Sequence, residues 1–317
     1  MKNQKYLIKL VLSVFIFICC FCPAGKVFSA DNTLNIVHLT DVHIDTKSKT
    51  TNKRMLAESV NLLQDAISQI NKFENVDLVI FSGDVVNKPK EDEFKRFVTL
   101  ANTLKFPWLY STGNHDVGIG GGLSKARIIK VLNEKNPCFK QNTLYYSYCP
   151  NEKFLIIFMD GVIDNKITSN GYFPKEQLNW LEKQLRNNPD KKVIIVQHFP
   201  LAEPFKSDSH KITNSVEYMN IMEKYKNVAA VLSGHYHATK ITEKNHILHI
   251  NTPALVSYPN AFRQIKITSS GNKTNFDIKL VETNLKKVQQ SSKAASGSPA
   301  LDYGQEKDRS CNITITK

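Results

Sequence analysis

The sequence predicts an α/β fold, and three observations carry that prediction. Apolar runs rich in Val, Ile, Leu and Phe alternate along the chain with segments whose apolar residues recur at helical spacing. The runs lack the period-two alternation of half-exposed strands, as expected of strands that are covered on both faces. Polar residues follow several of the runs at their carboxyl ends. We therefore expect buried strands connected by helices that pack on the sheets.

The first half of the chain has the order strand, helix, strand, helix, strand. The strands are expected at 34–39, 76–81 and 107–111, which are short and apolar. The connecting helices are expected near 52–72 and 91–104, where one face of each segment is apolar.

The second half repeats this style with strands and helices of similar length. Two strands, at 154–160 and 192–198, flank a helix near 174–187 that begins after a proline. A helix near 214–226 then precedes a strand at 227–235. Shorter strand-like pieces follow at 246–251, 262–268 and 275–282.

The composition limits the kinds of partner that the chain is expected to bind. Its 317 residues suffice for one large domain or two ordinary ones, and its formal net charge is +13. Lys supplies almost all of the positive charge, because Arg occurs only six times. The Lys residues are spread along the chain without Arg and aromatic clusters, so we expect no specific nucleic-acid surface. A positive field can instead attract anionic substrates.

The two ends of the chain differ from its centre. Residues 1–30 begin with three Lys residues within the first nine positions, followed by an apolar stretch over 10–22 and small residues at Ser29 and Ala30, which is the layout of a signal peptide. We therefore expect export, and an uncleaved N-terminal membrane anchor is the alternative. The folded domain is then 31–285, and the Lys-, Gln- and Ser-rich segment 286–317 is expected to be a disordered tail. In an exported chain Cys138 and Cys149 could form a disulfide, and two buried thiols are the alternative.

Polar side chains follow five of the expected strands. They are Asp41, His43, Asp84, Asn114, His115, Asp116, His198, His235 and His237. Ligands of open α/β sheets bind beyond the carboxyl ends of the strands, so we expect these residues to converge at one edge. Carboxylate, amide and imidazole groups suit first-row metal ions, and two adjacent ions form the clamp used in phosphoester displacement.

Each of these residues taken alone has a structural interpretation. Asp41 and Asp84 are ordinary turn residues, and a single histidine at a strand end is common. The combination carries the prediction, since five of the nine histidines lie at strand ends beside Gly, Asp or Asn. We assign the other four to structure or surface: His38, His210, His246 and His249.

Five short motifs give the chain a family resemblance. DVH at 41–43, GD at 83–84, GNHD at 113–116, His198 and GHYH at 234–237 resemble the signature of calcineurin-like metallophosphoesterases, in order, over about residues 34–252. The resemblance implies a four-layer α/β/β/α sandwich with two mixed β-sheets flanked by helices. It also implies a centre of two divalent or mixed-valence metal ions, drawn from Mn, Fe and Zn.

The resemblance also implies a role for each residue. One ion would be held by Asp41, His43 and His237. The other would be held by Asn114, His198 and His235, with Asp84 bridging the two ions. His115 would hydrogen-bond the phosphate and protonate the leaving alkoxide, and Asp116 would orient its ring.

Comparison of the branches of this family narrows the function. Purple acid phosphatases have a Tyr where this chain has Asn87, and lipid-A precursor pyrophosphatases have an Arg where it has His115. The phrases LTDVHI and VIFSGDVVN resemble the class III cyclic-nucleotide phosphodiesterases, although Gln197 stands where that branch usually has a histidine. We therefore expect metal-dependent hydrolysis of a phosphodiester or phosphomonoester, a nucleotide among the candidate substrates, by a metal-activated water outside the cytoplasm. A non-catalytic protein that binds metal or an anionic surface is the alternative. The loops at 117–150 and 199–215 are expected to shape the substrate pocket.

Overall fold

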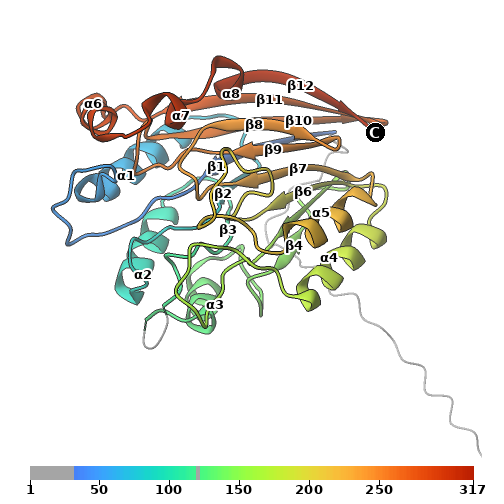
Figure 1. Ribbon diagram of the computed structural model, residues 1–317, viewed down its shortest axis with the longest axis horizontal. Helices are drawn as coiled ribbons and strands as arrows, with labels where there is room; N and C mark the ends of the chain where they lie inside the picture. The colour runs from blue at the N-terminus through green and yellow to red at the C-terminus, as the bar shows by residue number, and fades with distance from the viewer. Residues whose placement is uncertain (1–31, 119–121) are drawn as a thin grey trace, which may run out of the picture.

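Two six-stranded sheets pack face to face in the computed structural model, which describes residues 32–118 and 122–317. Both sheets are mixed and helices lie outside them, which confirms the predicted fold class (Figure 1). The expected signal segment, 1–30, lies outside the described residues.

The first sheet joins the strands that begin the chain to those that end it. Its order is β12-β11-β10-β1-β2-β3. β1, β2 and β3 are parallel, and β10, β11 and β12 continue the sheet in antiparallel pairs. The bounds are β1 (Thr33–Leu39), β2 (Leu78–Phe81), β3 (Trp108–Tyr110), β10 (Ala261–Ser270), β11 (Lys273–Glu282) and β12 (Ser310–Thr316).

The second sheet comes from the middle of the chain, in the order β4-β5-β6-β7-β9-β8. Its four central strands are parallel, and an antiparallel strand lies at each edge. The bounds are β4 (Tyr146–Tyr148), β5 (Phe154–Phe158), β6 (Lys192–Val196), β7 (Val228–Ser233), β8 (Lys240–Lys244) and β9 (Ile247–Asn251).

Amphipathic helices connect the parallel strands and bury their apolar faces. In Figure 1, α1 and α2 lie on one side of the pair of sheets, and α4 and α5 lie on the other. The bounds are α1 (Ser59–Ile70, after a short 3-10 turn at Leu56–Glu58), α2 (Glu91–Ala101), α3 (Lys125–Lys135), α4 (Lys175–Asn187) and α5 (Ser215–Glu223). Thus the segment 117–150, expected as a loop, contains α3 and β4.

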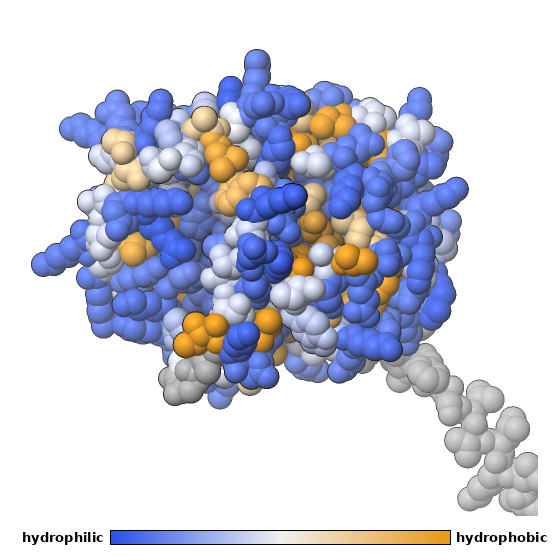
Figure 2. All heavy atoms as spheres, viewed as in Figure 1, coloured by the Kyte–Doolittle hydropathy of each residue, from blue (hydrophilic) through white to orange (hydrophobic). Residues whose placement is uncertain are grey.

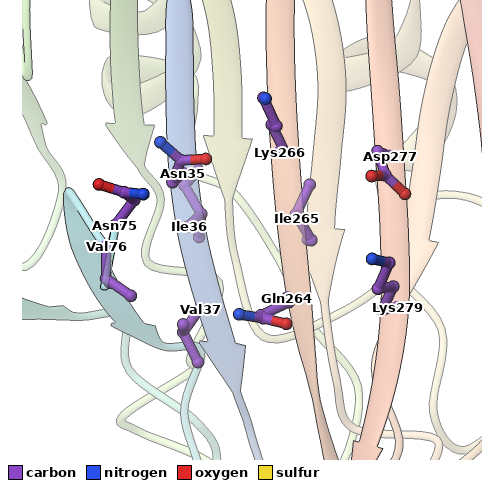
Figure 3. Close-up of a pocket in the computed structure, with 10 residues that line it drawn as sticks. All are labelled: Asn35, Ile36, Val37, Asn75, Val76, Gln264, Ile265, Lys266, Asp277 and Lys279. Atoms are coloured by element: carbon purple, nitrogen blue, oxygen red, sulfur yellow. The ribbon is translucent and has the colours of Figure 1, made fainter. Parts of the chain in front are cut away.

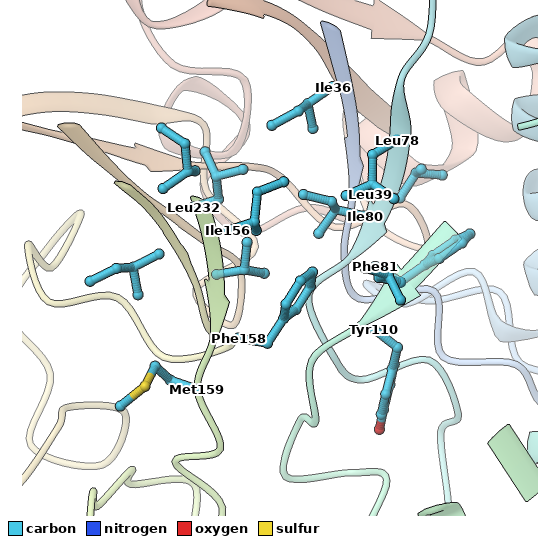
Figure 4. Packing of buried hydrophobic residues seen from close by; sticks show 14 of the residues in the cluster. Ile36, Leu39, Leu78, Ile80, Phe81, Tyr110, Ile156, Phe158, Met159 and Leu232 are labelled. Atoms are coloured by element: carbon cyan, nitrogen blue, oxygen red, sulfur yellow. The ribbon is translucent and has the colours of Figure 1, made fainter. Parts of the chain in front are cut away.

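The core lies between the two sheets. Ile36 and Ile80 point from the first sheet toward Ile156 and Leu232 of the second (Figure 4), and all four are at most 1% exposed. Their burial on both faces explains why the strands appear in the sequence as continuous apolar runs. The outer surface in Figure 2 is mainly hydrophilic, with apolar side chains gathered in a few patches.

A pocket of about 170 Å³ lies on the polar face of the first sheet, away from the strand ends (Figure 3). Asn35 of β1, Lys266 of β10 and Lys279 of β11 are among its lining residues. None of the predicted site residues lines it.

The prediction of a disordered tail at 286–317 is wrong. This segment forms α6 (Lys286–Ala295), α7 (Pro299–Tyr303), α8 (Glu306–Arg309) and β12. Its polar composition concealed long-range partners: β12 pairs with β11 over seven residues, and the Asp308 carboxylate accepts a hydrogen bond from the Ile241 backbone N–H at 3.1 Å. Across the described ranges, no helix is long and apolar enough to cross a membrane.

Candidate metal centre

The loops that follow β1, β2, β3, β6 and β7 bring the predicted residues to one edge of the sandwich. The His237 Nε2 lies 3.1 Å from the Asp41 Oδ1, and the His198 Nε2 lies 3.2 Å from the Asp84 Oδ2. Between these two pairs, the His43 Nε2 is 3.7 Å from an oxygen of each carboxylate. The two carboxylates therefore share one set of imidazoles.

These side chains form metal-binding groups whose ligand atoms lie within 4.8 Å of one another. Asp41, His43 and His237 form one group, and Asp84, His198 and His235 form another. A third group, His43, Asp84 and His115, overlaps both. The structure thus brings together six of the predicted ligands, arranged in the two predicted sets. Asp84 lies beside residues of both sets, since it is close to His43 and to His198.

Polar atoms of this cluster are buried without hydrogen-bond partners. They are Asp41 Oδ1, both ring nitrogens of His43, Asn114 Oδ1 and His235 Nε2. Unsatisfied buried polar atoms are rare in proteins because each costs desolvation energy. All of them belong to predicted ligands, so the residues present fit two metal ions.

The backbone is strained at the same residues. Eight non-glycine residues in the described ranges have positive φ angles, and five of them are predicted ligands: Asp41, His43, Asp84, His235 and His237. This conformation is unfavourable for side-chain-bearing residues and is concentrated at functional sites. The strain turns each side chain inward directly after its strand.

Glycines allow the ligand loops to approach one another. A Cβ atom at Gly113 would lie 2.1 Å from the Asp84 backbone nitrogen. At Gly234 it would lie 2.0 Å from the Thr40 Oγ1 and 2.5 Å from the Asp41 Oδ2. The glycines of the GNHD and GHYH motifs are therefore required by packing between segments distant in sequence.

The two carboxylates are held ionised. Burial alone would raise the pKa of Asp41, but His237 and His198 outweigh it and hold the pKa well below its usual range. The pKa of Asp84 is likewise lowered, since His198 and His115 outweigh burial. The backbone N–H of His115 also donates to the Asp84 Oδ1 at 2.7 Å, and that of His235 donates to the Asp41 Oδ2 at 2.9 Å.

The imidazoles of the cluster differ in charge. Burial lowers the pKa of His43 to about 3, and burial together with His198 lowers that of His235 well below its ordinary value. Both rings are therefore neutral, which is the form that binds metal. Burial also acts to lower the pKa of His198, but Asp84 and Asp41 raise it to about 9.

His115 lies at the rim of the cluster with its ring held by the backbone. Its Nδ1 is 2.8 Å from the Asn87 carbonyl oxygen, so Nδ1 carries the hydrogen and Nε2 faces the site. The ring centroid is 4.7 Å from that of His43. This placement is compatible with the predicted role in proton donation.

The predicted role of Asp116 in orienting the His115 ring is wrong. Its buried carboxylate accepts hydrogen bonds from the Tyr110 hydroxyl at 2.7 Å, and from the backbone N–H groups of Gly113 at 2.9 Å and Val86 at 3.1 Å. Asp116 therefore fixes the turn that carries Asn114 and His115. The Asn87 carbonyl takes the orienting position because the loop after β2 lies beside this turn.

Two residues near the cluster had no assigned role in the sequence. The Arg54 Nη1 lies 3.4 Å from the His115 Nε2. The ring of His210, assigned to structure or surface, lies 5.1 Å from that of His235. Lys211, the next residue of this loop, pairs with Asp208 at 2.7 Å.

Buried carboxylates and imidazoles in two adjoining sets, at the strand ends of an α/β sandwich, define a dinuclear metallohydrolase. Residues 34–239 match the family model described as calcineurin-like phosphoesterase, and the chain belongs to that family, the metal-dependent phosphoester hydrolases.

Relatives agree with this assignment. A "probable glycerophosphodiester phosphodiesterase" of Arcobacter nitrofigilis is 30% identical over 67% of this chain and 75% of the relative. A 3′,5′-cyclic adenosine monophosphate phosphodiesterase of Haemophilus influenzae is 22% identical over 81% of this chain and 91% of its own. A dimetal phosphatase from Danio rerio shares the fold, with a TM-score of 0.62 and 15% identity over 89% of this chain and 98% of that one.

Proposed function

We propose that this hydrolase acts on small phosphodiesters, with phosphomonoesters as the second class of substrate. The observation that carries the proposal is the cluster of unsatisfied, buried ligand atoms around Asp41, Asp84 and their histidines. The choice of diesters is supported by relatives named as glycerophosphodiester and cyclic-nucleotide phosphodiesterases. Nucleotides and glycerophosphodiesters are therefore the first substrates to test.

The ligand set suits Mn, Fe or Zn ions. A relative from Arabidopsis thaliana, 23% identical, is named as a manganese-dependent diphosphatase, which makes Mn²⁺ the first ion to test. Asp41, His43 and His237 would hold one ion, Asn114, His198 and His235 the other, and Asp84 would lie between them. Bound there, the ions supply positive charge for the phosphoryl oxygens and activate a water for attack.

Backbone carbonyl oxygens orient two histidine rings of the site. The His198 Nδ1 donates to the Ser82 carbonyl at 2.8 Å, which fixes the ring with Nε2 toward Asp84. His115 is fixed in the same way by Asn87, so its Nε2, once protonated, is the atom that would deliver a proton to the leaving oxygen. Polar backbone contacts thus set the orientation of both rings before substrate binds.

The activity can be tested on the full chain, stripped of metal and reloaded with Mn²⁺, Zn²⁺ or Fe²⁺. We expect hydrolysis of bis-p-nitrophenyl phosphate, faster than that of p-nitrophenyl phosphate, and of at least one cyclic nucleotide or glycerophosphodiester. Bound metal is measured on the same samples by elemental analysis. Two bound ions without hydrolysis of any ester would overturn the proposal in favour of a non-catalytic metal-binding protein.

We also propose that the chain acts outside the cytoplasm. The proposal is supported by the basic, apolar and small-residue order of residues 1–30. Expression of the full chain followed by fractionation and N-terminal sequencing tests it. We expect an exported protein cut near Ser29 or Ala30, whereas an uncut protein in the membrane fraction would indicate an anchor, and an uncut protein in the cytosol would contradict export.

A further inference from the structure

Arg54 lies at the entrance to the metal centre, on the segment between β1 and the 3-10 turn. Its Nη1 is 3.4 Å from the His115 Nε2. The Asn87 carbonyl can only accept, so the His115 Nδ1 donates to it, and the Arg54 guanidinium can only donate, so the His115 Nε2 accepts its hydrogen bond. The arginine therefore covers the ring nitrogen that faces the substrate.

The backbone fixes Arg54 relative to the metal ligands. The N–H of Met55 donates to the Val256 carbonyl at 2.8 Å, and the Val256 N–H donates to the Asp41 carbonyl at 3.2 Å. The Met55 side chain is 2% exposed, so it anchors the segment in the core. The position of the guanidinium is thus coupled to the ligand loop after β1 through two hydrogen bonds.

The charge of Arg54 has no carboxylate partner. Within 32–118 and 122–317, no Asp or Glu oxygen lies within ion-pair distance of its guanidinium, whereas the Arg127 Nε pairs with Glu91 at 2.6 Å. The hydrogen-bond partner of its guanidinium is the His115 ring nitrogen instead. The positive charge of Arg54 also lowers the pKa values of His43 and His210, although burial has the larger effect on both.

We propose that Arg54 is a substrate-binding residue that donates to a non-bridging oxygen of the phosphoryl group. A guanidinium presents paired N–H groups whose geometry matches phosphate, and it stays charged at every working pH. On substrate binding it would exchange its hydrogen bond with the His115 Nε2 for one with the phosphoryl oxygen, which would free Nε2 to take up from solvent the proton that it then delivers to the leaving oxygen. This inference rests on the proposed phosphoesterase function.

The proposal predicts a preference that depends on substrate charge. A phosphomonoester carries up to two negative charges on its phosphoryl group near neutral pH, and a phosphodiester carries one. The attraction to a fixed cation is therefore greater for the monoester. Loss of the cation should shift the enzyme toward diesters.

Three variants separate substrate binding from a structural role. Arg54→Gln removes the charge, and Arg54→Lys keeps the charge but lacks the paired N–H groups of the guanidinium. Lys49→Gln removes one exposed charge from the same segment and serves as the control. We would measure kcat and KM for p-nitrophenyl phosphate and its bis ester, together with inorganic phosphate binding by calorimetry on the Mn²⁺-loaded full chain.

We expect Arg54→Gln to lower kcat/KM by about 10-fold for the diester and about 100-fold for the monoester, since charged hydrogen bonds contribute at this level. Phosphate binding should weaken by about 10-fold or more on the same ground. Arg54→Lys should recover part of the phosphate binding, and Lys49→Gln should match the parent.

Equal losses for both esters with unchanged phosphate binding would overturn the proposal, because that result assigns Arg54 only to holding the His115 ring. Parent-like kinetics in Arg54→Gln would overturn it as well. An inactive parent chain would contradict the proposed function instead, and phosphate binding by the parent and Arg54→Gln would still decide whether Arg54 binds the anion.

Discussion

Histidines of this chain differ in the hydrogen-bond partners of their ring nitrogens. A carbonyl oxygen fixes the tautomer of His115 and of His198, since it can only accept a hydrogen bond. The His43 ring nitrogens have no hydrogen-bond partner in the structure. Because the His43 ring lies between the carboxylates of Asp41 and Asp84, a metal ion bound there would explain this state.

Replacement of His115 tests the division between ligands and acid. We expect His115→Asn to lower kcat by about 10²- to 10⁴-fold, the usual contribution of a general acid, while bound metal stays at the parent level. Steady-state kinetics and elemental analysis provide the two readouts. His246→Asn, at a ring that is 74% exposed, is the matched control. A loss of metal in step with activity would make His115 a ligand, as its nearness to His43 and Asp84 permits.

Gly234 tests the packing between ligand loops. In Gly234→Ala the new methyl group would meet Thr40 and Asp41, so we expect a loss of about 1–3 kcal/mol in the free energy of unfolding from overpacking. Displacement of Asp41 should also weaken Mn²⁺ binding by about 10-fold or more. Urea unfolding of the metal-free chain and calorimetry measure the two effects. Gly297→Ala, with open space around the new atom, should leave both unchanged, and parent-like behaviour of Gly234→Ala would contradict the close approach.

The cluster of candidate ligands could be predicted from the sequence, whereas the residues that contact it from neighbouring loops could not. Asp41, Asp84 and His198 follow apolar strands, so the pattern of the strands reveals them. Arg54 lies in a polar loop with no motif, and its position depends on a backbone contact between segments about 200 residues apart. The partners of Asp116 depend likewise on how the loops after β2 and β3 meet.

Among the strands, those buried on both faces were predicted, as were the partly exposed β10 and β11, whereas β4, β8 and β12 were missed. β1, β2, β5, β6 and β7 are continuous apolar runs, and each was expected within a few residues of its observed bounds. β4 has only three residues, and β8 is a polar strand at the edge of its sheet. Such strands are specified by the neighbour they pair with rather than by their own composition.

Substitutions in β12 test whether the C-terminal segment 286–317 is folded. Its Ile315 side chain is 2% exposed and packs into the core. We expect Ile315→Ala to lower the free energy of unfolding by about 2–4 kcal/mol, as for other buried isoleucines. The exposed neighbour Thr316→Ala should change it by less than about 0.5 kcal/mol. Urea unfolding measures both, and equal stability of the two variants would restore the expectation of a disordered tail.

In the whole molecule, the two sheets are joined beside the metal centre by a buried histidine. His38 lies on β1, and its Nε2 is 2.8 Å from the Ser82 Oγ of the same sheet. Its Nδ1 is 2.8 Å from the Thr252 Oγ1, which follows β9 of the other sheet. The ring is fully buried, so protonation would place a charge between the sheets. The stability of the sandwich should therefore depend on pH.

Burial, with a smaller effect of Arg263, lowers the pKa of His38 from 6.5 to about 3. The unfolded chain therefore binds a proton at this residue below about pH 6.5, whereas the folded chain does not until about pH 3. The contribution of the neutral ring to stability is present above pH 6.5 and is lost as the pH falls toward 3. Between pH 7 and pH 5 the loss is about 2 kcal/mol, from about 1.4 kcal/mol per pKa unit.

A variant without an ionisable side chain at residue 38 should not lose this part of its stability at low pH. We expect His38→Gln to be less stable than the parent at pH 7, because it loses one of two buried hydrogen bonds. Its further destabilisation between pH 7 and pH 5 should be about 2 kcal/mol smaller than that of the parent. Urea unfolding with EDTA present measures this, because metal release then contributes to neither chain. His246→Asn should retain the slope of the parent, and an equal slope in His38→Gln would assign the acid sensitivity to other groups.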